Sequence, residues 1–267
     1  MIARAYTYIR WLSLDIVAGA VFVSAFLSRE LGVSLTTVES ALLALAVWSV
    51  YTIDHLRDSA KGHLTTERRK FHFRNRRMLK MLLGLSVAIT VVLLCFVSNT
   101  VLFLGLGLAG FVGAYLLLAQ SLKGMKECAG ALLYSTGILL VPFVKGELSA
   151  VLPIGVLLFL LAFLNLLIYA VLERADDARE GFHSFVHQFG ERPAGVVIWI
   201  TAILSFVGSV VMFCFDYSVM LVLFFVVATL VHVLIWRVGW FHTNERYRII
   251  GDLIFLFPGI LLLLERV

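Results

Sequence analysis

Residues 150–172 read AVLPIGVLLFLLAFLNLLIYAVL and contain no charged side chain. The hydrocarbon core of a membrane is about 30 Å thick, and an α-helix needs about 20 apolar residues to cross it. Because backbone polar groups in lipid must bond within their own segment, a helix is the default spanning element. The apolar residues of this run are continuous, whereas a strand of a membrane barrel alternates apolar and polar residues. The run therefore predicts a transmembrane helix.

The composition of the whole chain agrees with this prediction. The 267 residues are 61% hydrophobic and 15% charged, with a mean hydropathy of +0.98. Soluble proteins are about 45–50% apolar and about 25% charged, so lipid must surround most of this surface. No stretch is polar enough to fold separately in water, and we expect one transmembrane domain over residues 1–267. The formal net charge of +5 is concentrated in a few loops, which favours membrane orientation over nucleic-acid binding.

Further apolar runs extend the prediction to an all-α integral membrane protein with nine transmembrane helices. Short polar turns such as Ser98-Asn99-Thr100 are typical of tight hairpins between antiparallel helices. The predicted helices cover residues 11–28, 37–53, 78–97, 100–119, 128–144, 150–172, 194–214, 217–236 and 249–264.

The positions of Lys and Arg predict the orientation of these helices. With the N-terminus inside, 19 of the 22 Lys and Arg residues fall in inside segments, and only Arg29, Lys145 and Arg266 fall outside. Cytoplasmic loops carry an excess of Lys and Arg, so we expect a cytoplasmic N-terminus and an outside C-terminus. The two longest polar loops, about residues 54–77 and 173–193, then cap a cytoplasmic face. We expect the bacterial inner membrane as the location.

Two pairs of carboxylates stand at the ends of the second and sixth predicted helices. Asp54 and Asp58 form one pair, and Glu173 and Asp177 form the other, each with a spacing of four residues. On a continuing helix such residues share one face, where two like charges repel. Magnesium prefers oxygen ligands and is typically held by one or two carboxylates plus substrate phosphates. The two pairs therefore predict a Mg²⁺ site for a diphosphate, with all four carboxylates as metal ligands and catalytic residues.

Basic residues on the same side complete this predicted site. A diphosphate carries about three negative charges, and cations usually steady it and stabilise its departure. The run from Arg68 to Lys80 is also typical of anchoring against anionic lipid headgroups. Asp15 lies inside the first predicted helix, where an acid is a functional candidate by default. Its side chain either faces the cavity near the acceptor or pairs with a basic group, and Asp252 raises the same question. The predicted substrate-binding residues are Lys61, Arg68, Lys123, Lys126, Arg179 and Asp15.

The two motifs resemble those of the UbiA superfamily of intramembrane prenyltransferases. That family has nine helices and two aspartate-rich motifs, which follow its second and sixth helices. The second motif often reads DxxxDxxxG, followed by a Thr or Ser and then a Gly. This chain has Glu in place of the first Asp, and its matching residues are Glu173, Asp177, Gly181, Ser184 and Gly190.

The first motif departs from the family pattern. It keeps its later two acids, but Val50 and Tyr51 stand where the family has Asn and Asp. The family's Tyr-xxx-Lys on the fourth helix is also not cleanly present, because Ala119 follows Tyr115 at that spacing. Either the chain binds its metal with fewer ligands, or it does something other than standard aromatic prenylation.

The resemblance implies a Mg²⁺-dependent prenyltransferase. Such an enzyme transfers a prenyl group from a polyisoprenyl diphosphate to an aromatic or lipid acceptor within the membrane. The altered first motif leaves a UbiA-type terpene cyclase open. A non-catalytic relative, or a carrier of a cation or solute, is also left open, although carriers usually place ionisable residues near the bilayer midplane. The acceptor, the prenyl chain length and the oligomeric state stay open.

Overall fold

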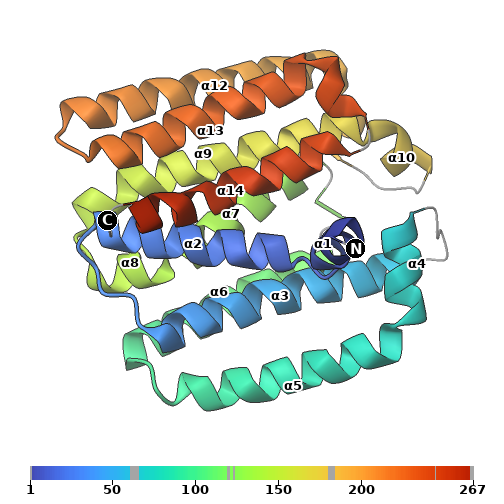
Figure 1. Ribbon diagram of the computed structural model, residues 1–267, viewed down its shortest axis with the longest axis horizontal. Helices are drawn as coiled ribbons and strands as arrows, with labels where there is room; N and C mark the ends of the chain where they lie inside the picture. The colour runs from blue at the N-terminus through green and yellow to red at the C-terminus, as the bar shows by residue number, and fades with distance from the viewer. Residues whose placement is uncertain are drawn as a thin grey trace.

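The protein is all-helical wherever its structure is described, in a computed structural model whose ribbon is drawn in Figure 1. The described residues are 2–60, 66–118, 121–122, 124–179, 184–243 and 245–264, without the side chains of 2–5, 176 and 264. In chain order the helices are α1 (Ile2–Trp11), α2 (Leu14–Glu30), α3 (Thr37–Ala60), α4 (Glu67–Arg74), α5 (Arg76–Leu94), α6 (Asn99–Leu118), α7 (Lys126–Ile138), α8 (Leu140–Lys145), α9 (Leu148–Leu172), α10 (Arg174–Arg179), α11 (Phe185–Phe189), α12 (Glu191–Cys214), α13 (Val219–Arg237), the 3₁₀ turn η1 (Gly239–His242) and α14 (Arg246–Leu264).

Each range predicted to span the membrane is occupied by helix. The fifth range is divided between α7 and α8, and each of the others contains most of one long helix. Among the described residues, α3, α5, α6, α9, α12 and α13 are the six helices long and apolar enough to cross a membrane. Nine crossings, and the predicted sides of the two termini, stay predictions.

Apolar side chains face outward along the helices at the edge of the bundle. On α5 and α6 the side chains of Met81 and Leu117 are 74% and 77% exposed. Large contiguous apolar surfaces are rare on soluble monomers and mark contact with another apolar phase. With six candidate spans, this surface makes the chain an integral membrane protein.

The bundle has α12 and α13 on one side and α3 and α5 on the other, with α2, α9 and α14 between them (Figure 1). Of these, α2 packs extensively on α14, and α9 packs on α7, α12 and α13. The side chains at the centre of this packing include Phe26, Leu161, Leu164, Phe224, Phe225 and Phe255.

Two glycines allow α2 and α14 to lie close together. A Cβ added at Gly19 would lie 3.0 Å from the Cβ of Phe255, and one added at Gly259 would lie 2.8 Å from the ring of Phe22. Small residues let membrane helices approach closely enough to pack their backbones. The first and last long helices are thereby fixed side by side.

A proline separates α7 from α8. Pro142 has no N–H, and its ring displaces the carbonyl four residues earlier, which belongs to Ile138. The Ser24 hydroxyl of α2 donates to that carbonyl at 2.8 Å. The helical hydrogen bond lost at the break is therefore replaced by a bond to the neighbouring helix.

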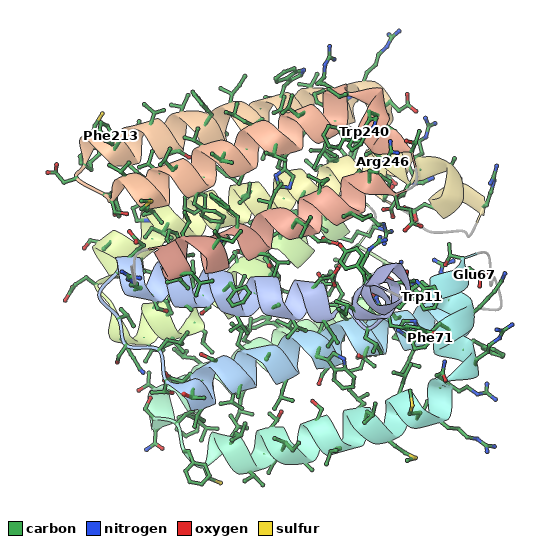
Figure 2. The ribbon with its side chains drawn as sticks, in the orientation of Figure 1. Trp11, Glu67, Phe71, Phe213, Trp240 and Arg246 are labelled. Atoms are coloured by element: carbon green, nitrogen blue, oxygen red, sulfur yellow. The ribbon has the colours of Figure 1, made fainter. Side chains whose placement is uncertain are left out.

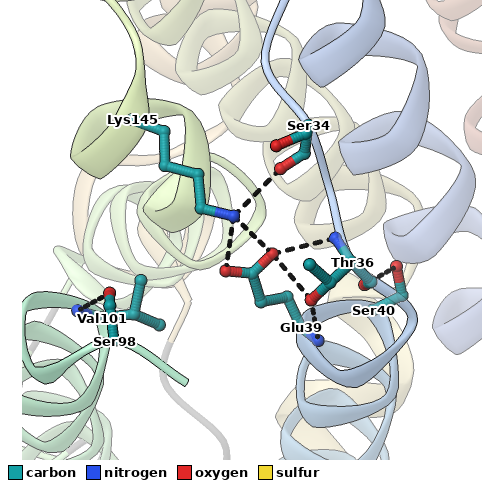
Figure 3. A network of polar contacts seen from close by, with 7 residues as sticks. All are labelled: Ser34, Thr36, Glu39, Ser40, Ser98, Val101 and Lys145. Atoms are coloured by element: carbon teal, nitrogen blue, oxygen red, sulfur yellow. Dashed lines mark hydrogen bonds and ion pairs between the residues drawn. The ribbon is translucent and has the colours of Figure 1, made fainter. Parts of the chain in front are cut away.

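An ion-pair network closes one end of the bundle. Lys145 of α8 donates to Glu39 of α3 at 2.8 Å and to the Ser34 carbonyl at 3.0 Å (Figure 3). Thr36 donates to the same carboxylate through its N–H and its hydroxyl, both at 2.9 Å. This network fixes the start of α3 to α8, and the short helices α1, α4 and α10 lie at the opposite end (Figure 1).

Candidate functional site

The candidate site lies at this opposite end, which we call the charged end. It is formed by α1, α4 and α10, the last turns of α3 and α9, and the first turns of α7 and α14. Glu67 and Arg246 lie at the charged end, whereas Phe213 lies at the other (Figure 2). The loops that carry both acidic motifs therefore meet on one side of the bundle.

The carboxylates of the first motif share a helix face. Because α3 continues past both residues, Asp54 and Asp58 stand one turn apart on that face. Asp58 lies close enough to repel the Asp54 carboxylate, which Arg57, Arg68 and Lys126 attract in turn. The Asp54 carboxylate is therefore near positive charge from α3, α4 and α7.

The first acid of the second motif is held in an ion pair. Glu173 ends α9, and its Oε1 accepts from Nε of Arg248 on α14 at 2.6 Å, while its Oε2 accepts from Nη2 of the same guanidinium. Burial raises the pKa of Glu173, but the charge and hydrogen bonds of Arg248, together with the Arg68 charge, outweigh it, so the pKa is lowered from its ordinary value. The last acid of the motif, Asp177, lies one turn further along on α10.

Arg68, which comes from α4, lies near the ion pair between Glu173 and Arg248. Thr66 caps the start of that helix, and its side chain accepts from the Arg69 N–H at 3.4 Å. Trp11 of α1 packs on Phe71 with ring centroids 5.3 Å apart. Burial, followed by repulsion from the nearby Arg248 charge, lowers the pKa of Arg68 to about 10. Arg68 therefore stays protonated at neutral pH, next to a second guanidinium.

Lys126 lies at the start of α7, beside a buried carboxylate. Its Nζ is 4.0 Å from Oε1 of Glu127, and that oxygen also accepts from the Phe185 N–H at 3.2 Å. Tyr115 of α6 donates to the Lys126 carbonyl at 3.4 Å. These bonds connect the ends of α6 and α7 to the start of α11, and they hold Lys126 near the first motif.

The other basic residues predicted to bind substrate are Arg179, Lys61 and Lys123. Arg179 lies on α10 and is exposed. Lys61 and Lys123 lie outside the described residues, so their predicted roles stay untested.

Two further acids lie deeper in the bundle. Asp15 of α2 is buried, with Oδ1 accepting from the Ile16 N–H at 3.0 Å. Asp252 lies one turn beyond Arg248 on α14 and accepts from the Tyr169 hydroxyl at 3.1 Å. The two carboxylates are near enough to repel each other. Asp15 is thus inside the bundle, as the sequence predicts, and faces a second acid.

Polar residues at four-residue intervals give a signal that the sequence analysis missed. On α9, Asn165, Tyr169 and Glu173 stand on one face, and on α14 Arg248 and Asp252 do the same. Each α9 side chain in this row has a polar partner on another helix, and that of Asn165 is His232 of α13 at 3.1 Å. Such a row on an apolar helix could have indicated that α9 and α14 face each other.

The two motifs differ in their fit to a divalent cation. Among the described residues, no group of three or more His, Cys, Asp or Glu side chains lies close enough together to hold a metal. Asp54 and Asp58 suit a cation that is held by two carboxylates and by substrate phosphates. Glu173 does not suit it, because both of its oxygens face Arg248.

Comparison with known proteins supports the fold. No family model and no curated protein matches the sequence. Among solved structures, the apo structure of a UbiA homologue from Aeropyrum pernix K1 has a TM-score of 0.70 at 14% identity, over 95% of this chain and 98% of that chain. The chain has the UbiA fold. The resemblance expected from the two motifs is therefore confirmed at the level of the fold.

Two further UbiA structures agree over nearly the full chain. A UbiA homologue from Archaeoglobus fulgidus bound to Cd²⁺ has a TM-score of 0.65 at 14% identity, over 94% of this chain and 97% of that chain. A digeranylgeranylglyceryl phosphate synthase has a TM-score of 0.61 at 12% identity, over 97% of this chain and 99% of that chain.

Proposed function

We propose that this UbiA-fold chain transfers a prenyl group from a polyisoprenyl diphosphate to a hydrophobic acceptor within the membrane, with Mg²⁺ as cofactor. The observation that supports it most is the meeting of Asp54 and Asp58 with the cations Arg68 and Lys126 at one end of an apolar bundle. A diphosphate with an apolar tail needs a charged site for its head directly beside an apolar region for its tail. The Archaeoglobus homologue bound to Cd²⁺ supports a divalent cation.

The roles follow from charge and position. Asp54 and Asp58 would hold Mg²⁺, which would neutralise negative charge on a departing diphosphate; a ligand role for Asp177 stays a prediction. Arg68 and Lys126 bind phosphate oxygens through charge-assisted hydrogen bonds, which strengthen as the allylic C–O bond breaks and its electron pair leaves with the diphosphate. The resulting carbocation is attacked by the acceptor, which then loses a proton.

The apolar interior protects this step. Water would capture the carbocation, and the packed bundle below the charged end excludes it. Asp15, buried on α2 below the charged end, is proposed to lie near the acceptor. We further propose that residues 1–267 form one domain, with the charged end facing the cytoplasm of a bacterial cell.

A direct test is diphosphate release by the purified chain in detergent, with geranyl, farnesyl and geranylgeranyl diphosphates as donors and a lipid extract as acceptor source. We expect release from at least one donor, stopped by EDTA and by Asp54→Asn. The matched control is Asp216→Asn at an exposed position. The backbone of Asp216 is in the left-handed region, which asparagine tolerates. Folded protein that releases diphosphate from none of the donors, or equally well after Asp54→Asn, contradicts the proposal.

A UbiA-type terpene cyclase is the second candidate, and Tyr51 favours it. This aromatic residue stands one turn before the Asp54 carboxylate, where the family has an acid, and the two side chains are near neighbours. An aromatic face stabilises a nearby cation, which suits a carbocation that reacts internally. Product mass separates the candidates, because a transferase yields a prenylated acceptor and a cyclase yields a free hydrocarbon or terpene alcohol.

A further inference from the structure

The ion pair between Glu173 and Arg248 joins the second acidic motif to the last helix. The guanidinium approaches with Nε and Nη2, so each carboxylate oxygen accepts one hydrogen bond. The Tyr247 side chain hydrogen-bonds the same carboxylate. The Glu173 and Arg248 side chains are only 17% and 23% exposed. Two parallel bonds of this kind fix the guanidinium in both position and plane.

This pair leaves Glu173 poorly suited to a divalent cation. A metal bound to either carboxylate oxygen would lie next to the guanidinium, and in a partly buried site the two positive charges repel strongly. If a metal displaced the Arg248 guanidinium from Glu173, the guanidinium would lose its paired carboxylate among the ends of α9, α14 and α4, which is costly. The Glu173 carboxylate is thus already paired with a cation, the Arg248 guanidinium.

Arg248 also provides the positive charge that a metal bound at the second motif would provide. It lies near Arg68, and Glu173 attracts both guanidiniums while they repel each other, so two positive charges stand close together at the charged end. Below it, the Tyr169 ring centre lies 6.0 Å from the guanidinium carbon. Guanidinium groups match phosphate oxygens in a fork geometry.

We propose that Arg248, held in place by Glu173, takes the place of a metal ion at the second motif, so that the chain binds a single divalent cation through Asp54 and Asp58 and holds the diphosphate with Arg248 and Arg68. This inference rests on the proposed function. The Glu at position 173, where the related motif has Asp, fits it, because one more methylene lets the carboxylate reach across to α14.

The first measurement is the number of Mn²⁺ ions bound by the full chain in detergent, by electron paramagnetic resonance, with farnesyl thiodiphosphate present. We expect a single Mn²⁺ per chain. Glu173→Gln keeps that number with an affinity within about threefold, because no metal ligand is lost, whereas Asp54→Asn weakens Mn²⁺ binding by about tenfold or more. Two bound ions in the wild type, or none, overturn the inference, as does loss of Mn²⁺ in Glu173→Gln.

A charge exchange keeps the test decisive if Glu173→Gln does not fold. The double variant Glu173→Arg with Arg248→Glu restores an ion pair but removes the carboxylate from α9. It retains the single Mn²⁺, measured without the thiodiphosphate, if Arg248 replaces a metal. It loses Mn²⁺ if Glu173 is a metal ligand, which overturns the inference.

Arg248→Lys tests the contact with the diphosphate. Lys keeps the charge but not the fork, so we expect an affinity for farnesyl thiodiphosphate about tenfold weaker and an unchanged Mn²⁺ number. Unchanged thiodiphosphate affinity overturns the role of Arg248. The proposed function fails by a different result, the absence of diphosphate release from every donor, which the Mn²⁺ number does not affect.

Discussion

The two acidic motifs of this chain are alike in sequence and different in structure. Each has carboxylates four residues apart at the end of a long helix. In the first, α3 runs through both acids, and they face cations from three helices. In the second, α9 ends at Glu173, whose carboxylate is bound by Arg248 of α14. Spacing thus decides which face a carboxylate occupies, and a residue distant in sequence decides what it does there.

The largest expected difference between the motifs is in turnover. Asp54→Asn should slow diphosphate release at least about 100-fold, because a group that acts on developing charge is lost. Glu173→Gln should slow it only about tenfold, because it loosens a residue that supports the site. Initial rates at saturating donor measure both, and Asp216→Asn and Glu147→Gln are matched controls at exposed positions. Equal losses in the two variants would show that both acids do the same work.

The next effect concerns stability. Arg248→Met leaves the Glu173 charge partly buried and unpaired, which should reduce the free energy of unfolding by about 3 kcal/mol. The double variant with Glu173→Leu removes both charges, and it should recover most of that loss without recovering turnover. Unfolding in detergent and SDS mixtures measures the stability, with exposed Arg77→Met as control. A double variant as unstable as Arg248→Met would contradict the ion pair as the cause.

A smaller effect is expected at the other end of the bundle. Lys145→Met removes one partner of Glu39, but Thr36 still donates to that carboxylate twice (Figure 3). We expect a loss of about 1–3 kcal/mol in unfolding free energy, with turnover within about twofold because the sites are distant and independent. The exposed Lys80→Met is the control. A large loss of turnover in Lys145→Met would mean that the two ends are coupled.

The fold could be predicted from the sequence wherever apolar runs decide it. Lipid requires long apolar helices, so ranges such as 150–172 coincide with helices in the structure. The loop predicted at 54–77 instead contains α4, eight charged and aromatic residues with no apolar period. Its signals were the capping Thr66, the acidic Glu67 in the first turn and the basic Arg74 in the last, which favour a helix through its dipole.

The site could be predicted only as far as single helices allow. Asp54 and Asp58 share a face because of local spacing, which a sequence displays. Arg248 was counted only as a loop cation, because the one local sign that α14 meets α9, the rows of polar residues at four-residue intervals on both helices, was missed. Which residues of the two rows meet depends on how the bundle closes, through glycines such as Gly19 and Gly259, and a single helix does not display this.

The smallest effect tests the ion pair through pH. Burial raises the pKa of Glu173, but the charge and hydrogen bonds of Arg248, with the Arg68 charge, lower it by more, so its folded pKa lies below its ordinary value. That ordinary value is roughly 4.3 in an unfolded chain. A carboxyl with a depressed folded pKa stabilises the fold fully above the unfolded value, and this stabilisation disappears as the pH falls through the folded value. Between these two pKa values the unfolding free energy of the wild type should therefore fall more steeply than that of Glu173→Gln, which has no proton to gain. Unfolding at a series of pH values from 6 downwards, in the same detergent, measures the difference. Parallel curves would mean that Arg248 does not hold Glu173 in its charged form, and the contrast between the two motifs would then need another cause.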